Sequence, residues 1–344
     1  MNDRFLRACR REPVDATPVW FMRQAGRYMP EYQAIRASRS LLQICREPEL
    51  AIEVTLQPVR RIAVDAAILF SDLLLPLEPM GLTFDFVKGE GPAFDNPVRS
   101  AADVERVRPI DPADAMAHVL ETIRGLKEVL TVPLIGFVGA PFTLASYAVE
   151  GGPSKSFALT KAMMYTEPEA WHTLCARLAD MAGTYLRAQI EAGVDAVQVF
   201  DSWVGHLDAR DYREFALPHT RRLFAHLDGL STPSIHFGVG TSMLLPDMRE
   251  AGGDVIGADW RIPLDRAWDL IGHDRGIQGN LDPTLLLGPT GRLRAGVEDV
   301  LARAAQRPGH IFNLGHGVLP MTSLSAVQRV AEWVHTMSAR PADA

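Results

Sequence analysis

The feature that most constrains this chain is a series of short, continuous apolar runs, each ending in polar residues or glycine. Runs of this kind, without alternation of apolar and polar residues, are typical of parallel strands covered on both faces. We read eight of them as buried strands, at 19–22, 66–70, 134–138, 196–200, 234–237, 255–258, 276–279 and 310–314.

Most of the intervals between these runs carry helical signals. The clearest extends from Glu167 to Gly193, where Pro168 suits a first helical turn and Gly193 suits a helix end. Two helix-to-strand joints, 191–195 and 250–254, resemble each other. Repeated helix–strand units predict an α/β fold, and eight of them predict a single (β/α)8 TIM-type barrel. A doubly wound open sheet is the alternative.

Length and composition agree with one barrel domain over residues 1–344. The 344 residues are 47% hydrophobic and 22% charged, which is ordinary for a globular protein. The long interval 71–131 contains Phe84, Phe86 and several glycines and prolines at 89–97, which predict a hairpin inserted between the second and third strands, before a helix near 114–129. Residues 338–344 are expected to form a frayed tail.

Charge and cysteine usage exclude several classes of protein. The net charge of −7 gives no basic face for nucleic acid, so an anionic ligand needs a local group of arginines. The cysteines, Cys9, Cys45 and Cys175, form no CxxC motif, which favours a reducing compartment. With no secretory signal and no apolar run of membrane-spanning length, we expect a cytoplasmic protein. Nucleotide-binding and metal-binding motifs are absent, so neither ligand is expected.

In a barrel the active site lies at the carboxyl ends of the strands. The polar residues that follow the apolar runs, or lie at their ends, are Arg23, Gln24, Gly26, Arg27, Tyr28, Ser71, Asp72, Tyr147, Asp201, Ser202, His236, Asp259, Asn280 and His316. None of them is a cysteine, so chemistry that needs a thiol nucleophile is not expected.

Arg23 and Arg27 are four residues apart beside Gly26, so both can reach one ligand if the segment turns. Arginine forks bind carboxylates or phosphates through paired hydrogen bonds. The alternative is a solvated basic loop that forms an ion pair with Glu31. Asp72 lies between two apolar stretches, where a carboxylate is costly unless it is paired. It either caps a helix or accepts hydrogen bonds from a ligand and stabilises positive charge.

Three further residues are weaker candidates. Glycines on both sides of His316 allow a close approach to a ligand, although a lone histidine is more often structural. Ser202 and Tyr147 carry hydroxyls, which commonly bond to nearby backbone when they are buried. Asp201 and Asp259 can be read simply as helix caps.

Five segments of the chain resemble sequence blocks of the uroporphyrinogen decarboxylase family, in the same order. They are PVWFMRQAGRYMPEY at 18–32, AILFSD at 67–72, GFVGAPFTLASY at 136–147, QVFDS at 198–202 and NLGHG at 313–317. The first block is long and specific, and the resemblance covers the chain from about Pro18 to His316.

The resemblance implies decarboxylation of the four acetate side chains of uroporphyrinogen III to methyls, without metal or organic cofactor, by a homodimer. It implies Asp72 and Arg23 as catalytic residues. The substrate-binding residues that it implies are Arg23, Gln24, Ala25, Gly26, Arg27, Asp72, Tyr147, Ser202 and His316. In this family Asp72 would accept hydrogen bonds from the pyrrole N–H groups and stabilise a ring cation.

Other consequences of the resemblance stay open. Arg23 is one candidate proton donor, but an arginine is a poor acid, so a water or a substrate carboxyl held by the arginine is an alternative. Many family members have paired phenylalanines where this chain has Leu41 and Leu42.

Two rival classes can be compared with this reading. Related barrel methyltransferases that serve corrinoid proteins need zinc on a His-x-Cys pair, and here that stretch reads His236-Phe237-Gly238. A tetrapyrrole carrier without activity would keep Arg23 and Arg27 but would not need Asp72.

Overall fold

The computed structural model describes residues 2–87 and 91–340. The helices are α1 (Arg4–Cys9), α2 (Pro30–Arg36), α3 (Leu41–Arg46), α4 (Pro48–Arg61), α5 (Ala101–Val104), α6 (Pro112–Ala115), α7 (Ala117–Val129), α8 (Pro141–Glu150), α9 (Ala158–Thr166), α10 (Pro168–Ala192), α11 (Ala209–Phe215), α12 (Leu217–Ala225), α13 (Leu245–Ala251), α14 (Leu264–Ile271), α15 (Thr290–Ala304) and α16 (Leu324–Ser338). The strands are β1 (Ala67–Ile68), β2 (Phe84–Val87), β3 (Gly91–Phe94), β4 (Leu134–Gly139), β5 (Ala196–Asp201), β6 (Ser234–Gly238), β7 (Val255–Gly257), β8 (Gly276–Gln278) and β9 (His310–Ile311).

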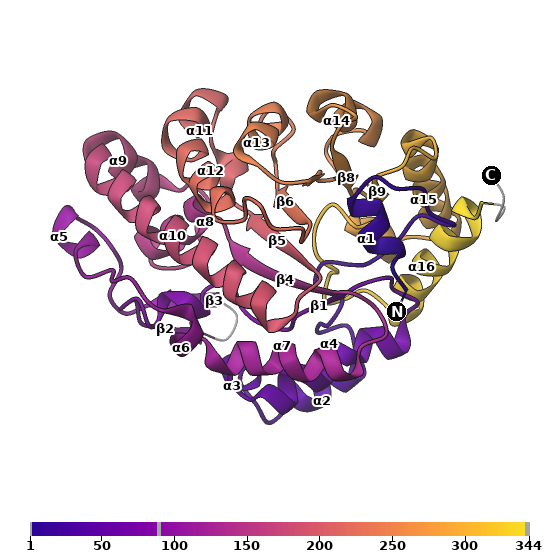
Figure 1. Cartoon of the computed structure of the whole chain (residues 1–344), viewed down its shortest axis with the longest axis horizontal. Coiled ribbons are helices and arrows are strands. Elements are labelled where there is room, and N and C mark those ends of the chain that lie inside the picture. Colours follow the sequence, from indigo (N-terminus) through magenta and orange to yellow (C-terminus); the bar gives the residue numbers. More distant parts are fainter. Residues whose placement is uncertain (1, 88–90, 341–344) are drawn as a thin grey trace.

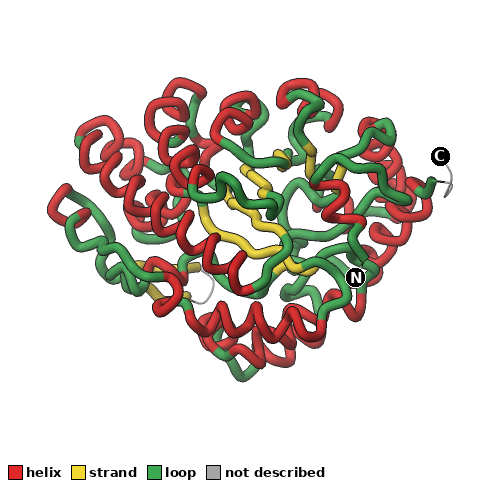
Figure 2. The backbone as a smooth tube through the Cα atoms, in the orientation of Figure 1, coloured by secondary structure: helices red, strands yellow, loops and turns green. Residues whose placement is uncertain are grey.

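Seven parallel strands form one curled sheet in the order β1-β4-β5-β6-β7-β8-β9. Most of the helices surround this sheet on its outer side, whereas α1 contributes Phe5, Ala8 and Cys9 to the inner side (Figures 1 and 2). Strand order follows chain order without the reversal that defines a doubly wound sheet, so that alternative is wrong. The prediction of an α/β fold with a parallel sheet is confirmed.

Seven of the eight predicted strands match β1 and β4–β9 within a few residues. The first, at 19–22, does not form a strand, because only Val19 makes a bridge, to Phe312. Hydrogen bonds nevertheless join this segment to both ends of the sheet. The Phe312 N–H donates to the Pro18 carbonyl (2.8 Å), and the Asp65 N–H donates to the Val19 carbonyl (2.8 Å). The chain turns soon after, where Arg23 has a positive φ of 59°.

A small apolar core fills the inner side of the sheet. Its buried members are Phe5, Ala8, Cys9, Val14, Trp20, Met22, Ala66, Ile135, Ala196, Ile235, Phe237, Val255 and Ile311. A chain of buried hydrogen bonds crosses this interior: the Trp20 indole donates to Gln278 (3.0 Å), whose amide donates to Gln198 (3.0 Å). Residues from distant parts of the sheet are therefore tied together through its centre.

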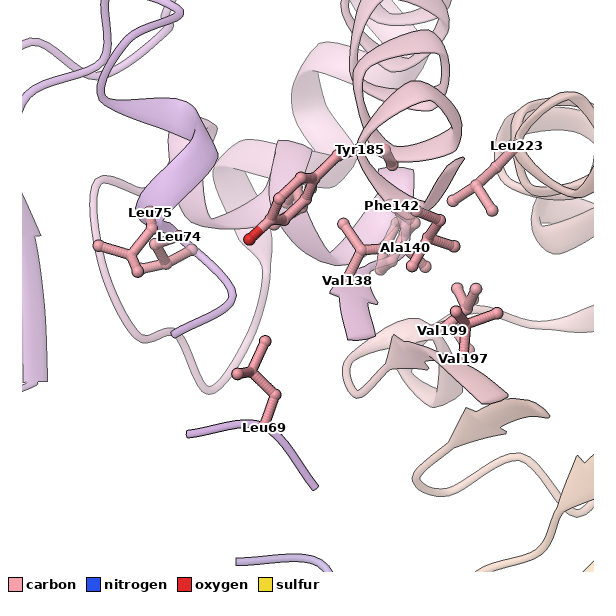
Figure 3. Packing of buried hydrophobic residues seen from close by; sticks show 14 of the residues in the cluster. Leu69, Leu74, Leu75, Val138, Ala140, Phe142, Tyr185, Val197, Val199 and Leu223 are labelled. Atoms are coloured by element: carbon pink, nitrogen blue, oxygen red, sulfur yellow. The ribbon is translucent and has the colours of Figure 1, made fainter. Parts of the chain in front are cut away.

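A larger core lies between the sheet and the helices. Alternate residues of β5, Val197 and Val199, belong to it, whereas Ala196 belongs to the inner core. This alternation follows from the period of two in a strand. Figure 3 shows Val197 and Val199 with Tyr185 of α10 and other members of this layer. The long helix that the sequence predicts is confirmed as α10, with Gly193 at its end in a conformation of φ +120°.

Strands β2 and β3 pair antiparallel in the long interval between β1 and β4. The prediction placed an inserted hairpin in this interval, and residues 88–90, which would form its turn, lie outside the described part of the chain. The helix expected near 114–129 is divided at Met116 into α6 and α7.

The two ends of the described chain are bound to each other. Ser338, the first residue of the expected tail, is buried, and its hydroxyl accepts a hydrogen bond from the Thr17 N–H (2.8 Å). The Arg340 N–H donates to the Asp15 carbonyl (2.7 Å). Residues 341–344 lie outside the described residues. Over 2–87 and 91–340, no helix has both the length and the apolar character needed to cross a membrane.

Candidate active site

The loop that follows the apolar segment 19–22 is held in place by hydrogen bonds from buried side-chain amides. Gln24 is fully buried; its side-chain oxygen accepts from the Phe21 N–H (3.1 Å), and its nitrogen donates to the Ala66 carbonyl (3.1 Å). Asn313, close to the carboxyl end of β9, accepts a hydrogen bond from the Met22 N–H (3.1 Å). The side chain of Gln24 thus shapes the loop, and its contact with a substrate stays a prediction.

Arg23 and Arg27 are the exposed side chains of this loop, while Ala25 and Gly26 between them are half-buried. Among the described residues, neither arginine forms an ion pair, and Glu31 instead pairs with Arg61. The alternative of a basic loop neutralised by Glu31 is therefore wrong. Both guanidinium groups are available for an anionic ligand.

Asp72 follows β1 on the chain and is partly exposed. One of its oxygens, Oδ1, accepts a hydrogen bond from the Leu74 N–H (2.9 Å). Within the described part of the chain, Oδ2 has no hydrogen-bond partner. Loss of hydration raises the pKa of Asp72, and the Leu74 N–H and the charge of Arg23 oppose this rise. One carboxylate oxygen is therefore free to accept hydrogen bonds from a ligand.

Tyr147 of α8 stacks on Trp203, with the ring centroids 3.7 Å apart. Burial raises the pKa of Tyr147 to about 12, with a further rise from Asp72 and a decrease from Arg23. The phenol therefore stays neutral near pH 7 and can donate a hydrogen bond to an anion. Ser202 precedes Trp203 at the end of β5 and is half-buried, and within the described residues its side chain forms no hydrogen bond with the other candidates.

His316 lies in a glycine loop that packs between two other parts of the site. A β-carbon on Gly315 would lie 2.3 Å from the Trp260 nitrogen, and one on Gly317 would lie 2.5 Å from the Arg23 side chain. Position 315 therefore requires glycine because it faces backbone, whereas a larger residue at 317 would force the Arg23 side chain to move. Burial, together with the charges of Arg23 and Arg261, lowers the pKa of His316 to about 4. Its imidazole is neutral at physiological pH.

Aromatic side chains from three neighbouring strands form an apolar surface on the inner side of the sheet. Phe137 of β4 meets Phe200 of β5 edge-to-face at 5.6 Å, and Phe200 meets Phe237 of β6 at 6.1 Å. Phe137 and Phe200 are partly exposed. Leu41 and Leu42 begin α3, where Leu42 is buried in the outer core.

Arg23 is the common neighbour of three predicted site residues, because its charge acts on Asp72, Tyr147 and His316. These side chains come from the ends of parallel strands or the loops that follow, which meet at one edge of the sheet. The charge of Arg27 instead acts on Tyr32 of α2. The arrangement combines positive charge, one free carboxylate oxygen and neutral hydrogen-bond donors.

Trp260 and Arg261 directly follow Asp259 and were not among the candidates predicted from the sequence. The Trp260 ring contacts the His316 ring edge-to-face at 6.3 Å, and the Arg261 guanidinium lies 3.9 Å above the Trp260 ring. Their position just past the end of β7 was the signal that could have identified them.

Outside this site, the residues that the structure describes give no support to metal or thiolate chemistry. No group of three or more histidine, cysteine or acidic side chains within 2–87 and 91–340 is arranged to hold a metal ion. Burial raises the pKa of the Cys9, Cys45 and Cys175 thiols, which disfavours thiolate chemistry. A surface cavity of about 480 Å³ beside α15 and α16 is lined by none of the predicted site residues.

A curled parallel sheet with arginines, a carboxylate and a histidine at its carboxyl edge is the arrangement of a barrel-type enzyme that binds an anionic small molecule. A family model described as "Uroporphyrinogen decarboxylase (URO-D)" matches residues 1–337. The chain belongs to this family.

Close relatives match over nearly the whole chain. A protein from Sorangium cellulosum named uroporphyrinogen decarboxylase is 54% identical over 98% of this chain and 97% of its own length. A protein of the same name from Carboxydothermus hydrogenoformans is 54% identical, with the same coverage of 98% and 97%.

Solved structures agree on the fold. A methyltransferase from Methanosarcina mazei superposes with a TM-score of 0.79 at 20% identity, over 97% of each chain. A B12-independent methionine synthase from Shewanella sp. W3-18-1 gives 0.57 at 12% identity, over 83% of this chain and 87% of its own. At these identities the similarity is one of fold alone.

Proposed function

We propose that this protein decarboxylates the four acetate side chains of uroporphyrinogen III, giving coproporphyrinogen III in tetrapyrrole biosynthesis. The observation that carries the proposal is the placement of Asp72 within the field of the exposed Arg23. In the described part of the chain, one Asp72 oxygen has no hydrogen-bond partner and Arg23 forms no ion pair. Family membership and relatives at 54% identity support the same reaction.

In this proposal, charge and hydrogen bonds bind the substrate. The tetrapyrrole carries eight carboxylates, and the forks of Arg23 and Arg27 suit bidentate contacts to some of them. Neutral Tyr147 and His316, with Ser202, donate or accept hydrogen bonds that orient the side chains. The backbone of Ala25 and Gly26 lines the approach to Arg23, and the partly exposed rings of Phe137 and Phe200 offer an apolar surface to the macrocycle.

The chemistry needs no added electron sink, because the pyrrole accepts the electrons. Protonation of a pyrrole ring carbon gives a cation. The C–C bond to the acetate carboxylate then breaks, CO2 leaves, and the bonding electrons neutralise the ring. The exocyclic carbon takes up a proton to become the methyl group, and the ring proton is lost.

Asp72 has the central role in this sequence. The four pyrrole N–H groups converge on its free oxygen, and its negative charge stabilises the ring cation in a partly desolvated setting. For the first proton we propose either Arg23 or a water or substrate carboxyl held by it. Because arginine gives up protons poorly, Arg23 acts more effectively by orienting the donor than by being one.

We further propose that the segment 18–22 closes the sheet into an eight-membered barrel that forms one domain, with β2 and β3 as an inserted hairpin. The hydrogen bonds from this segment to Phe312 and Asp65 support closure. We also propose a cytoplasmic homodimer that works without metal or organic cofactor, as in the family that the sequence resembles.

The test is an anaerobic assay of chelator-treated protein with uroporphyrinogen III, in which the oxidised products are separated by their number of carboxyl groups. Accumulation of the four-carboxyl product without any addition is the expected result. Tight binding of the substrate without product would instead indicate a tetrapyrrole carrier, and it would overturn the proposed activity.

A further inference from the structure

Arg261 is an arginine at the carboxyl edge of the sheet that none of the roles above employs. It follows the end of β7, and its position is set by two contacts. Its guanidinium lies 3.9 Å above the Trp260 ring, and its NH1 group donates to Asp259. A cation stacked on an aromatic ring and held by a carboxylate is restricted in orientation before any ligand arrives.

Most of the hydrogen-bonding capacity of Arg261 is unused. A guanidinium has five N–H donors. In the described part of the chain only NH1 has a partner, and the side chain is 48% exposed. Asp259 does not depend on the guanidinium alone, because its oxygens also accept hydrogen bonds from the Gly240 N–H and from the Arg261 N–H (3.0 Å). The ion pair with Asp259 therefore uses only part of the hydrogen-bonding capacity of Arg261.

The location of Arg261 relates it to the site. The His316 loop packs against the Trp260 backbone at Gly315 and against the Arg23 side chain at Gly317. Arg23 and the Trp260–Arg261 pair thus lie on two sides of this loop. Arg261 follows β7 and Asp72 follows β1, and three strands, β4, β5 and β6, lie between β1 and β7 in the sheet. The charge of Arg261 acts on His316, whereas the arginine whose charge acts on Asp72 is Arg23. Arg261 is therefore near the site but remote from the carboxylate that we assign to the ring cation.

We propose that Arg261 is a further substrate-binding residue, which holds one propionate carboxylate of the tetrapyrrole across the His316 loop from Arg23. This inference rests on the proposed function and extends it. An acetate that reacts has to lie near Asp72, whereas propionates persist from substrate to product. A residue remote from Asp72 therefore suits a propionate, and its contact serves every one of the four decarboxylations.

The experiment compares R261Q and R261K with the wild type. The matched control is R249Q on α13, because Arg249 likewise donates to a single aspartate, Asp274 (2.7 Å), and among the described residues its side chain makes no hydrogen bond to the strand-end residues of the site. The readouts are the KM and kcat for uroporphyrinogen III, the Kd for coproporphyrinogen III from anaerobic equilibrium dialysis, and the thermal midpoint.

We expect R261Q to raise both KM and Kd about 10-fold, which corresponds to the loss of one charge-assisted hydrogen bond. The kcat should stay within about twofold, because the contact is the same in ground state and transition state. R261K should recover part of the binding, since it keeps the charge but loses the fork. R249Q should match the wild type in all readouts.

Two outcomes overturn the inference while the proposed function survives. One is wild-type turnover with KM and Kd unchanged in R261Q. The other is a lowered thermal midpoint and a lowered kcat at unchanged Kd, which would mean a structural role. Conversely, Kd raised by R261Q in a protein without turnover would uphold the binding role and overturn the decarboxylase. Absence of both binding and turnover in the wild type would overturn both.

Discussion

Replacing Asp72 with asparagine tests the electrostatic role of this carboxylate most sharply. Asparagine keeps the size of the side chain and an oxygen that can accept from the Leu74 N–H, but it removes the negative charge. A cation about 4 Å from a carboxylate gains roughly 4 kcal/mol at an effective dielectric constant near 20. Because each 1.36 kcal/mol is a factor of ten in rate, the full effect is about 10³-fold. Partial exposure of Asp72 weakens it, so we expect kcat to fall about 10²- to 10³-fold.

The same substitution should not weaken the fold. Burial raises the pKa of Asp72, so the folded protein binds this proton more tightly than the unfolded chain does. The ionised carboxylate consequently costs folding free energy once the pH exceeds the usual aspartate range near 4. Asp72→Asn removes that cost, and its thermal midpoint at pH 7 should equal or exceed that of the wild type.

The assay measures single-turnover decarboxylation and thermal unfolding on the same preparations. Asp111→Asn is a matched control, because Asp111 accepts from a backbone N–H two residues ahead, as Asp72 does, but is exposed at the start of α6. The control should keep wild-type kcat. A kcat for Asp72→Asn within threefold of the wild type would refute the electrostatic role, and a large loss of stability would refute the desolvation argument.

Three further predictions concern binding, acid sensitivity and the core. Arg27→Ala should raise KM about 10-fold with kcat within twofold, because an exposed charge-assisted contact is lost; an unchanged KM would contradict this. His316 has its pKa lowered to about 4, so the unfolded chain takes up this proton first as the pH falls from about 6.5 to 4, and stability falls with it. The thermal midpoint of His316→Gln should therefore drop less over this range, and equal drops would refute the assignment. The buried carboxylate of Asp65 accepts hydrogen bonds from the Val19 N–H and from Arg4. Asp65→Ala should therefore lower the free energy of unfolding, measured with denaturant, by about 3–5 kcal/mol. A loss below 1 kcal/mol would contradict the importance of this network.

The strands were predictable because burial on both faces of a strand requires a continuous run of apolar residues. Seven apolar runs correspond to strands, since these lie between the helices and an inner side filled by apolar residues and buried hydrogen bonds. The run at 19–22 has the same composition but pairs only at Val19. Its ladder is interrupted because the loop must turn at Arg23 to meet Asn313, and that constraint comes from a segment almost 300 residues away.

The neighbours of Arg23 were predictable where they follow the ends of strands, while their roles in a reaction stay predictions. Asp72, Tyr147 and His316 follow strand ends, and the structure brings all three into the field of Arg23. The inward orientation of Gln24 could not be read from the sequence, because it depends on the Ala66 carbonyl of a neighbouring segment.

The partners in ion pairs and ring contacts could not be predicted from the sequence either. Glu31 is four residues from Arg27 but pairs with Arg61 of α4. Trp260 and Arg261 approach His316 only because the ends of β7 and β9 lie at the same edge of the sheet. Contacts of this kind are set by strand order, which local patterns do not contain.

The most direct test of the account is the stoichiometry of CO2 release. Chelator-dialysed protein in excess is mixed anaerobically with uroporphyrinogen III labelled in its acetate carboxyl groups, and released CO2 is counted per tetrapyrrole. The account predicts four CO2 per molecule without any added cofactor. Release that requires an added metal or cofactor, or no release from bound substrate, would contradict it.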